Sequence, residues 1–225
     1  MSALAVITGR SRVEFGECDL DDATAGDLGA SYALLDTAER SRAAAFVFDL
    51  DRNRFVQAHG YLRRRLGVFL GLAPERVPIV APKDDKPFVE GRPIDFNLSH
   101  SGPLAVLAIA DDQQVGVDVE LLDWSQRFAE DLEGLAQSTL TAQEREALDA
   151  SPGAARIRRF FAFWTAKEAR MKLTGEGFRL DPLEIALELR GGDPIGYLRP
   201  LAPVADLRFI PLAYPGATCC LAVRA

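Results

Sequence analysis

Apolar side chains recur along this chain at the spacing of helices in two clear places. In residues 54–70 they follow one another at steps of three or four, and Gly71 stands where a helix cap is expected. A stronger pattern of the same kind runs over residues 157–174 and stops before Gly175. Residues 124–150 show a weaker and less regular helical pattern. The chain is therefore predicted to contain two long helices and a less regular helical stretch.

Strand patterns occupy most of the remaining sequence. Residues 104–110 form a compact apolar run, and in residues 115–120 valines alternate with polar residues. The four polar residues between them are typical of a turn, so we expect two adjacent antiparallel strands. Prolines make residues 73–95 a turn-rich connection with one short strand. Further strands are predicted in the short apolar runs 183–189, 207–213 and 218–223. This order of elements predicts a mixed α+β fold.

Composition narrows the class of protein. The chain has 225 residues, of which 48% are hydrophobic and 26% are charged, as expected for one large globular domain or two small ones. No apolar run approaches the roughly 20 residues of a membrane span, and the N-terminus shows no signal-peptide pattern. Cys18, Cys219 and Cys220 cannot form a disulfide framework, and the last two are interpreted as core residues. We expect an intracellular, cytoplasmic protein that does not enter a membrane.

Charge is distributed unevenly along the chain. The net charge of −7 argues against a general nucleic-acid-binding protein. Residues 1–39 carry a net charge of −6, whereas residues 40–65 contain seven arginines against two aspartates. A basic segment in an acidic protein favours a small polyanionic ligand. A solvated helix face is the alternative interpretation.

Two carboxylates lie on one face of the strand predicted at residues 115–120. Because side chains alternate between faces, Asp118 and Glu120 point the same way, about 6–7 Å apart. Aspartate is depleted in strand interiors, and Mg²⁺ with phosphate oxygens would account for such a pair. A solvent-facing strand is the other account.

A third acidic residue stands in an apolar setting. On the helix predicted at 157–174, Glu168 falls in the centre of the apolar stripe and Lys172 lies one turn further along the same face. A carboxylate there is costly unless it is paired or bound to a metal. Simple pairing of Glu168 with Lys172 stabilises a helix only slightly. We therefore favour a functional role for Glu168.

The segment before the strand at 104–110 offers polar groups close to these acids. Ser99 and His100 are expected near Glu120, where their side chains and free backbone N–H groups are suited to hold a phosphate or a base. Adjacent serine and histidine do not make a nucleophile–base pair. With only His59 and His100 in the chain, a histidine-rich zinc site is excluded.

Three motifs together resemble a known family. They are Asn97-Leu-Ser-His-Ser101, Gly116-Val-Asp-Val-Glu120 and Trp164-Thr-Ala-Lys-Glu-Ala-Arg-Met-Lys172, with Lys86-Pro87 upstream. Their order and approximate spacing resemble the signatures of 4′-phosphopantetheinyl transferases. The chain length and the arginine-rich helix look like the surfactin-synthetase-activating (Sfp-type) family. The resemblance covers roughly residues 38–180.

This resemblance implies a fold and an activity. The fold is two similar α/β subdomains, residues 1–112 and 113–225, in a pseudo-dimeric arrangement with the active site in the cleft between them. The activity is Mg²⁺-dependent transfer of 4′-phosphopantetheine from coenzyme A to a serine of an apo acyl or peptidyl carrier protein, releasing adenosine 3′,5′-bisphosphate. A monomer that serves fatty-acid or secondary-metabolite synthesis is expected, with no nucleic-acid or membrane partner.

The same resemblance assigns roles to individual residues. The implied Mg²⁺ ligands are Asp118, Glu120 and Glu168. The implied coenzyme A contacts are Arg42, Arg54, Lys86, Ser99, His100, Asp118 and Lys172. Glu168 and Lys172 are the implied catalytic residues, as general base and as a cation beside the leaving phosphate. Two positions depart from the family pattern: Glu39 replaces a basic residue, for which Arg40 is a candidate substitute, and Phe55 replaces a small hydroxyl residue.

Two other functions are compatible with these residues. A metal-dependent hydrolase of the coenzyme A pyrophosphate would consume coenzyme A without a carrier protein. A non-catalytic coenzyme A-binding module would keep the pocket without the chemistry.

Overall fold

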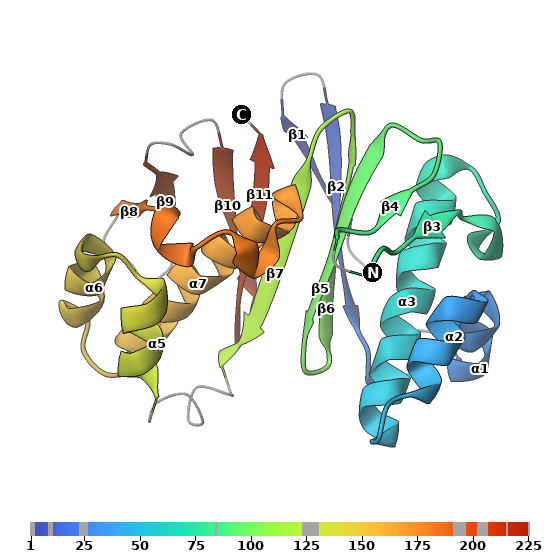
Figure 1. Cartoon of the computed structure of the whole chain (residues 1–225), viewed down its shortest axis with the longest axis horizontal. Helices are drawn as coiled ribbons and strands as arrows, with labels where there is room; N and C mark the ends of the chain where they lie inside the picture. Colours follow the sequence, from blue (N-terminus) through green and yellow to red (C-terminus); the bar gives the residue numbers. More distant parts are fainter. Residues whose placement is uncertain are drawn as a thin grey trace.

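The protein consists of two α/β halves that lie side by side, each with a sheet and one long helix (Figure 1). The computed structural model describes residues 3–8, 11–22, 27–83, 85–122, 131–190, 197–201, 207–214 and 216–224. The mixed α+β class predicted from the sequence is confirmed.

The first half contains a four-stranded antiparallel sheet with the strand order β1-β2-β6-β5. The strands are β1 (Ala3–Thr8), β2 (Ser11–Asp19), β5 (Ile94–Ser101) and β6 (Leu104–Asp111). The helices α1 (Leu28–Leu34), α2 (Thr37–Ala44) and α3 (Asp49–Leu70) lie on one side of it (Figure 1). A 3₁₀ turn at Pro74–Arg76 and the short pair β3 (Ile79–Val80) and β4 (Phe88–Val89) complete this half. The buried face of α3 packs on the sheet, with Leu62 and Leu66 in one cluster with Leu107.

The second half contains a three-stranded antiparallel sheet with the order β10-β11-β7. The strands are β7 (Val115–Leu121), β10 (Leu207–Tyr214) and β11 (Ala217–Arg224). The helices are α5 (Leu132–Thr139), α6 (Ala142–Asp149) and α7 (Ala154–Thr174), and two 3₁₀ turns follow at Gly177–Arg179 and Pro182–Glu184. The pair β8 (Leu187–Arg190) and β9 (Tyr197–Pro200) lies beyond them.

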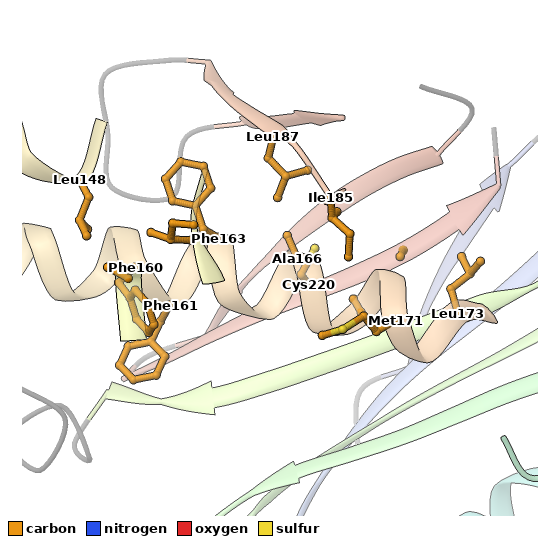
Figure 2. Close-up of a cluster of buried hydrophobic side chains, with 14 of the residues drawn as sticks. Leu148, Phe160, Phe161, Phe163, Ala166, Met171, Leu173, Ile185, Leu187 and Cys220 are labelled. Carbon is orange, nitrogen blue, oxygen red and sulfur yellow. The ribbon is translucent and has the colours of Figure 1, made fainter. Parts of the chain in front are cut away.

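The long helix α7 is anchored by its own hydrophobic cluster. Figure 2 shows Phe160, Phe163 and Met171 of α7 among side chains from other elements, including Cys220 of β11. Burial of an apolar side chain of this size contributes about 1.5–3 kcal/mol. Because this cluster fixes α7, it also fixes Glu168 and Lys172, which lie on the same helix.

The two sheets meet at a second core that crosses the boundary between the halves. The valines of β7 pack with residues of β2 and β6, including Val106 and Ala108. The expected hairpin of residues 104–110 and 115–120 is therefore wrong, because β6 and β7 belong to different sheets. Both edges of β6 are already hydrogen-bonded, to β2 and to β5. The chain turns at Asp112, which has a positive φ of 51°, and β7 pairs with β11 instead.

The long helices are longer than the apolar pattern predicts at their N-terminal ends. α3 begins at Asp49 instead of residue 54, and α7 begins at Ala154 instead of residue 157. Both C-terminal caps are confirmed, since Gly71 and Gly175 have positive φ angles of 67° and 75°. The strands β1, β2, β5 and β9 were not predicted.

The cysteines lie where the core interpretation places them. Cys219 and Cys220 are buried neighbours on β11, and Cys18 is also buried and free. No helix within the described ranges is both long and apolar enough to span a bilayer.

Candidate active site between the two halves

The two halves are joined by side chains of β5 that bind the backbone of β7. β7 is an edge strand of its sheet, so its outer N–H groups need partners. The amides of Val115, Val117 and Leu121 donate to the side chains of Asp95, Asn97 and Ser101 at 2.9, 2.7 and 3.2 Å. These acceptors stand two and four residues apart along β5 and therefore lie on one face of the strand. The polar face of one strand thus satisfies the open edge of the other, and it places the motif around Ser99 beside the motif around Asp118.

Asp118 is the centre of the site. It is 3% exposed, and its Oδ1 atom accepts from Ser99 Oγ at 2.9 Å and from Lys172 Nζ at 2.5 Å. Burial raises the pKa of Asp118 above its usual value, although Lys172 and Ser99 act in the opposite direction. Its Oδ2 atom is buried, and no described residue donates a hydrogen bond to it. A buried oxygen without a partner is unusual and favours an additional ligand at this position.

Two further carboxyl groups lie close enough to Asp118 for it to raise their pKa values. Glu120 accepts from Ser101 Oγ at 3.0 Å and forms a side-chain hydrogen bond with Trp164; burial and then Asp118 raise its pKa. Burial raises the pKa of Glu168 to about 7; Lys172 lowers it, while Asp118 and Glu120 add to the increase. The three acids therefore repel one another in a poorly solvated place.

This donor set fits a hard divalent cation. Three carboxylates supply only oxygen ligands, which suit Mg²⁺, and a cation would relieve both their mutual repulsion and the unpaired Oδ2 of Asp118. Among the described residues, no three acidic, histidine or cysteine side chains already converge as a metal cluster. Lys172 supplies the positive charge beside Asp118 in this structure. The fit rests on the chemistry of the donors and on the unpaired oxygen.

A glycine on β7 allows α7 to approach the site. A Cβ atom at Gly116 would lie 2.0 Å from the carbonyl oxygen of Ala169 and 2.5 Å from the amide nitrogen of Leu173. Both are backbone atoms of α7, which cannot rotate away as a side chain can. The absence of a side chain at Gly116 thus allows α7 to pack on β7 and places Glu168 and Lys172 near Asp118. This close approach of Gly116 to α7 was not predicted.

Gly116→Ala is expected to displace α7 and so to damage both stability and activity. Overpacking of this kind costs about 1–3 kcal/mol, and a shift of about 1 Å in a catalytic group can reduce turnover about 100-fold. Urea unfolding and turnover of the same preparation measure the two effects. Gly134→Ala in α5 is the matched control, because a Cβ there meets nothing within 4 Å. Unchanged turnover in Gly116→Ala would contradict this role.

A cavity of about 560 Å³ opens beside the site in the first half of the chain. Its walls come from α2, α3, residues 79–87 and β5, and they include Arg42, Phe55, His59 and His100. Burial lowers the pKa of His100, and the basic side chains of Lys172, His59, Arg54 and Arg42 lower it further. The volume is typical of a pocket for a small organic ligand.

Most of the basic segment is neutralised by acids of the chain. Ion pairs join Arg52, Arg54, Arg63 and Arg65 to Asp49, Asp21, Asp36, Glu39 and Glu14. The acidic N-terminal segment therefore serves largely as a counter-charge to the arginines. Arg42 has no ion pair to a described residue; its guanidinium lies over the ring of Phe55 at 5.3 Å from the centroid. Arg42 is thus the arginine of this segment that faces the cavity.

Two of the basic residues predicted to bind coenzyme A are occupied elsewhere. Arg54 makes a two-pronged contact with Asp21, at 2.8 and 2.6 Å, and does not line the cavity. Lys86 donates to Asp95 and to the carbonyl oxygens of Val115 and Leu173. Its ammonium therefore connects β5, β7 and the end of α7, and all three of its donors are used.

The remaining predicted residues are brought together. Ser99, Asp118 and Lys172 are in direct contact, and Glu120 and Glu168 lie close enough to act on the pKa of one another. Lys172 donates to Asp118 and Ser99, so the simple pairing with Glu168 does not describe how it is used. The hydrogen bond between Trp164 and Glu120 was not predicted from the sequence. The spacing of apolar residues in a sequence does not distinguish a tryptophan that only packs from one whose indole also donates a hydrogen bond.

Comparison with known proteins places the chain in a family. The profile of the 4′-phosphopantetheinyl transferase superfamily matches residues 114–218, which include β7, α7 and β10. The 4′-phosphopantetheinyl transferase HetI of Nostoc sp. is 39% identical over 160 residues, 69% of this chain and 66% of HetI. The chain belongs to the 4′-phosphopantetheinyl transferase superfamily.

Other members of this superfamily are similar over shorter shares of their length. The phosphopantetheinyl transferase of Thraustochytrium sp. is 31% identical over 76% of this chain and 62% of its own. The 4′-phosphopantetheinyl transferase psf-1 of Bacillus pumilus is 33% identical over 62% of this chain and 57% of its own. The chain thus spans just under two thirds of the length of the curated relatives it matches.

One solved structure overlaps with part of the chain. It is a holo-(acyl-carrier-protein) synthase from Bacillus anthracis in complex with coenzyme A (3′,5′-ADP), which is 20% identical with a TM-score of 0.40. It covers 49% of this chain and 94% of its own. An overlap of this extent carries no weight for the function.

Proposed function

We propose that this protein transfers the 4′-phosphopantetheine group of coenzyme A to a serine of an apo carrier protein and releases adenosine 3′,5′-bisphosphate. The observation that carries the proposal is Asp118, a buried carboxylate with an unpaired oxygen, beside Lys172 and next to a cavity lined by Arg42 and His100. Such an arrangement is suited to a substrate with phosphate groups and a metal ion. Membership of the superfamily supports the same reaction.

Three finer statements belong to this proposal. We place the protein in the Sfp-type family, because the chain has two α/β halves and the three motifs in the expected order. Residues 1–112 and 113–225 are the two subdomains, since the two main sheets use strands from one side of residue 112 or the other. The protein acts as a monomer, with both halves of the site on one chain.

Asp118, Glu120 and Glu168 are the residues that would hold Mg²⁺. When bound, the ion would neutralise charge on the pyrophosphate of coenzyme A. Phosphoryl transfer otherwise requires positioning and fixed charges from the protein. Lys172, whose ammonium already lies in the site, offsets charge on the leaving phosphate oxygen. Arg42 and His100 bind the nucleotide end in the cavity.

The reaction forms one bond and breaks one. The carrier serine oxygen attacks the phosphorus attached to pantetheine, and the bond from that phosphorus to the bridging oxygen breaks. Adenosine 3′,5′-bisphosphate leaves with that oxygen. The serine proton passes to Glu168, a carboxylate that α7 holds in the site beside Lys172.

Intact-protein mass spectrometry tests the proposal directly. An apo carrier protein incubated with this protein, coenzyme A and Mg²⁺ is expected to gain the mass of one phosphopantetheine. Chelation of the metal by EDTA should abolish the gain, and added Mg²⁺ should restore it. Loss of coenzyme A without any gain on several carriers would contradict transfer and identify a hydrolase. Binding of coenzyme A without turnover would identify a binding module.

A further inference from the structure

Lys86 connects three segments at the boundary between the two halves. Its ammonium donates to Asp95 of β5, to the carbonyl oxygen of Val115 at 2.6 Å and to that of Leu173 at 3.4 Å. Only 14% of the Lys86 side chain and 20% of the Asp95 side chain are exposed. A lysine has three hydrogen-bond donors, so none of them is left for a phosphate group.

The direction of the Lys86 side chain differs from that of its neighbours in the chain. Asp85 and Pro87, on either side of it, both line the cavity of about 560 Å³, whereas Lys86 does not. Asp95, its acidic partner, does not line the cavity either. The ammonium of Lys86 therefore lies behind the cavity wall, between that wall and the second half of the chain.

Asp95 keeps this ammonium in place and fixes the start of β7. Burial lowers the pKa of Lys86 and Asp95 opposes this change, so the carboxylate favours the charged lysine. Oδ2 of Asp95 also accepts from the amide of Val115 at 2.9 Å. The pair thus binds both backbone polar groups of Val115, the N–H through Asp95 and the carbonyl through Lys86. Asp118 follows three residues later on the same strand.

The C-terminal end of α7 is fixed to the same lysine. The last carbonyl groups of a helix have no partner within it, and a cation beside them is favourable. Lys86 provides a donor and a positive charge to the carbonyl oxygen of Leu173, the residue directly after Lys172. Gly175, which caps α7, packs against residue 86, since a Cβ atom there would lie 2.9 Å from Cβ of Lys86.

The position of Lys172 depends on this arrangement because its side chain crosses from α7 to the two strands. Its ammonium donates to Oδ1 of Asp118 at 2.5 Å and to Oγ of Ser99 at 3.0 Å. These partners lie on β7 and β5, the strands that Lys86 and Asp95 join. A change in the distance between α7 and β7 would therefore move the ammonium of Lys172 away from Asp118.

We infer that Lys86 and Asp95 are positioning residues that hold Lys172 beside Asp118, and that Lys86 makes no contact with coenzyme A. The inference rests on the proposed function. The family resemblance implies a contact between Lys86 and coenzyme A, but the three contacts of its ammonium and its place outside the cavity favour a positioning role instead.

Steady-state kinetics and isothermal titration calorimetry distinguish a positioning residue from a ligand contact. Lys86→Met and Asp95→Asn should each lower kcat for transfer by about 10- to 100-fold, because a displacement of about 1 Å in a catalytic group has an effect of this size. The Kd of coenzyme A should stay within about threefold of the wild type in both variants. A Kd raised about tenfold or more in Lys86→Met, with kcat unchanged, would overturn the inference.

Arg179→Gln is the matched control for these variants. Arg179 also joins the segment around Lys86 to the end of α7, because it contacts Asp85 and the carbonyl oxygen of Gly175, both at 3.1 Å. This ion pair is exposed, so its loss should leave kcat and the Kd of coenzyme A as in the wild type. A loss of kcat in Arg179→Gln as large as that in Lys86→Met would overturn the specific role of the buried pair.

The double variant Lys86→Met with Asp95→Asn tests whether the two residues act as one unit. Losses at independent residues multiply, whereas residues in one network show smaller combined losses. The double variant should therefore lose about as much kcat as Lys86→Met alone. Multiplied losses would overturn the pairing. Circular dichroism confirms the fold of each variant, and Asp95→Asn, which keeps an oxygen acceptor, carries the test if Lys86→Met does not fold.

Lysine NMR tests the same geometry without the reaction. The chain has four lysines, Lys83, Lys86, Lys167 and Lys172, so ¹³Cε labelling gives four signals, and single Lys→Arg variants at 83, 86 and 172 assign them. In Asp95→Asn, the signals of Lys86 and Lys172 should shift while that of Lys83 stays. An unchanged Lys172 signal would overturn the inference while transfer by the wild type stands. A wild type that transfers nothing to any carrier would overturn the proposed function, and the shift of Lys172 would still be measurable.

Discussion

Glu168→Gln should reduce phosphopantetheine transfer by about 100- to 10,000-fold while the protein keeps its fold. The amide removes the proton acceptor and one of the three carboxylates without changing the size of the side chain. Single-turnover transfer to an apo carrier, followed by intact-protein mass spectrometry, measures the loss. Glu176→Gln is the matched control, because Glu176 follows the same helix and pairs with Arg170 on the surface. Turnover within about threefold of the wild type would exclude Glu168 as the base.

The same variant has a second signature in the metal-free protein. The pKa of Glu168 is about 7 in the fold against a usual value of 4.5, so the folded state holds the proton more tightly than the unfolded chain. Stability must then fall as the pH rises from about 4.5 to about 7. Urea unfolding in EDTA at pH 5 and pH 8 should show this fall in the wild type and a smaller one in Glu168→Gln. Asp118 and Glu120 have raised pKa values too, so part of the slope will persist. An identical slope in both proteins would contradict the burial of Glu168.

The sequence predicted which residues carry the chemistry and which face of a strand they occupy, but it was less informative about which strands lie next to each other. Alternation in residues 115–120 correctly separated Asp118 and Glu120 from the valines that form the core between the sheets. It did not reveal which strand lies beside β7, because period two is the same whether a strand pairs with β6 or with β11. Strand pairing depends on which edges are free, and the partner of β7 comes from the end of the chain.

The residues of the site were predicted better than the residues that position them. A carboxylate in an apolar stripe and two on a strand are costly features that stand out in a sequence, and they do lie together. The groups that position them look ordinary by comparison. The side chains of Asp95 and Asn97 bind the edge of β7, and Lys86 bridges β5, β7 and α7. Their roles arise from contacts between segments far apart in the sequence, which neither spacing nor composition encodes.

Lysines of one motif illustrate the same limit. Lys167 and Lys172 are five residues apart on α7, and the sequence marks both as cations of a conspicuous segment. Lys172 is 30% exposed and donates to Asp118, whereas Lys167 is fully buried and pairs with Glu144. Lys167 donates to the carboxylate of Glu144 at 2.6 Å and to two carbonyl oxygens, of Thr139 and Pro182, at 2.8 and 2.9 Å. One ammonium thus connects α5, α6 and the turn after α7.

Lys167→Met should therefore destabilise the protein by about 3–5 kcal/mol, a large share of the 5–15 kcal/mol that stabilises a typical domain. Burial lowers the pKa of Lys167, but Glu144 opposes that shift, and the two charges compensate each other. Glu144 also accepts from the amides of Thr141 and Leu187, so the variant leaves a charged group buried without a cation. Urea unfolding at pH 7 measures the loss.

The double variant Lys167→Met with Glu144→Gln separates charge from packing. The amides of Thr141 and Leu187 donate to different oxygens of Glu144, so glutamine keeps an acceptor for only one of them, but it carries no charge. The double variant should therefore recover part of the stability that Lys167→Met loses. Lys172→Met should lower transfer, but it is no control for stability, because it also leaves the buried carboxyl group of Asp118 without its cation. If Lys167→Met were as stable as the wild type, the buried pair would not support the fold. Lys167 connects α7 to the helices α5 and α6. Its replacement is therefore also expected to lower transfer, and a higher substrate concentration should not restore the lost activity.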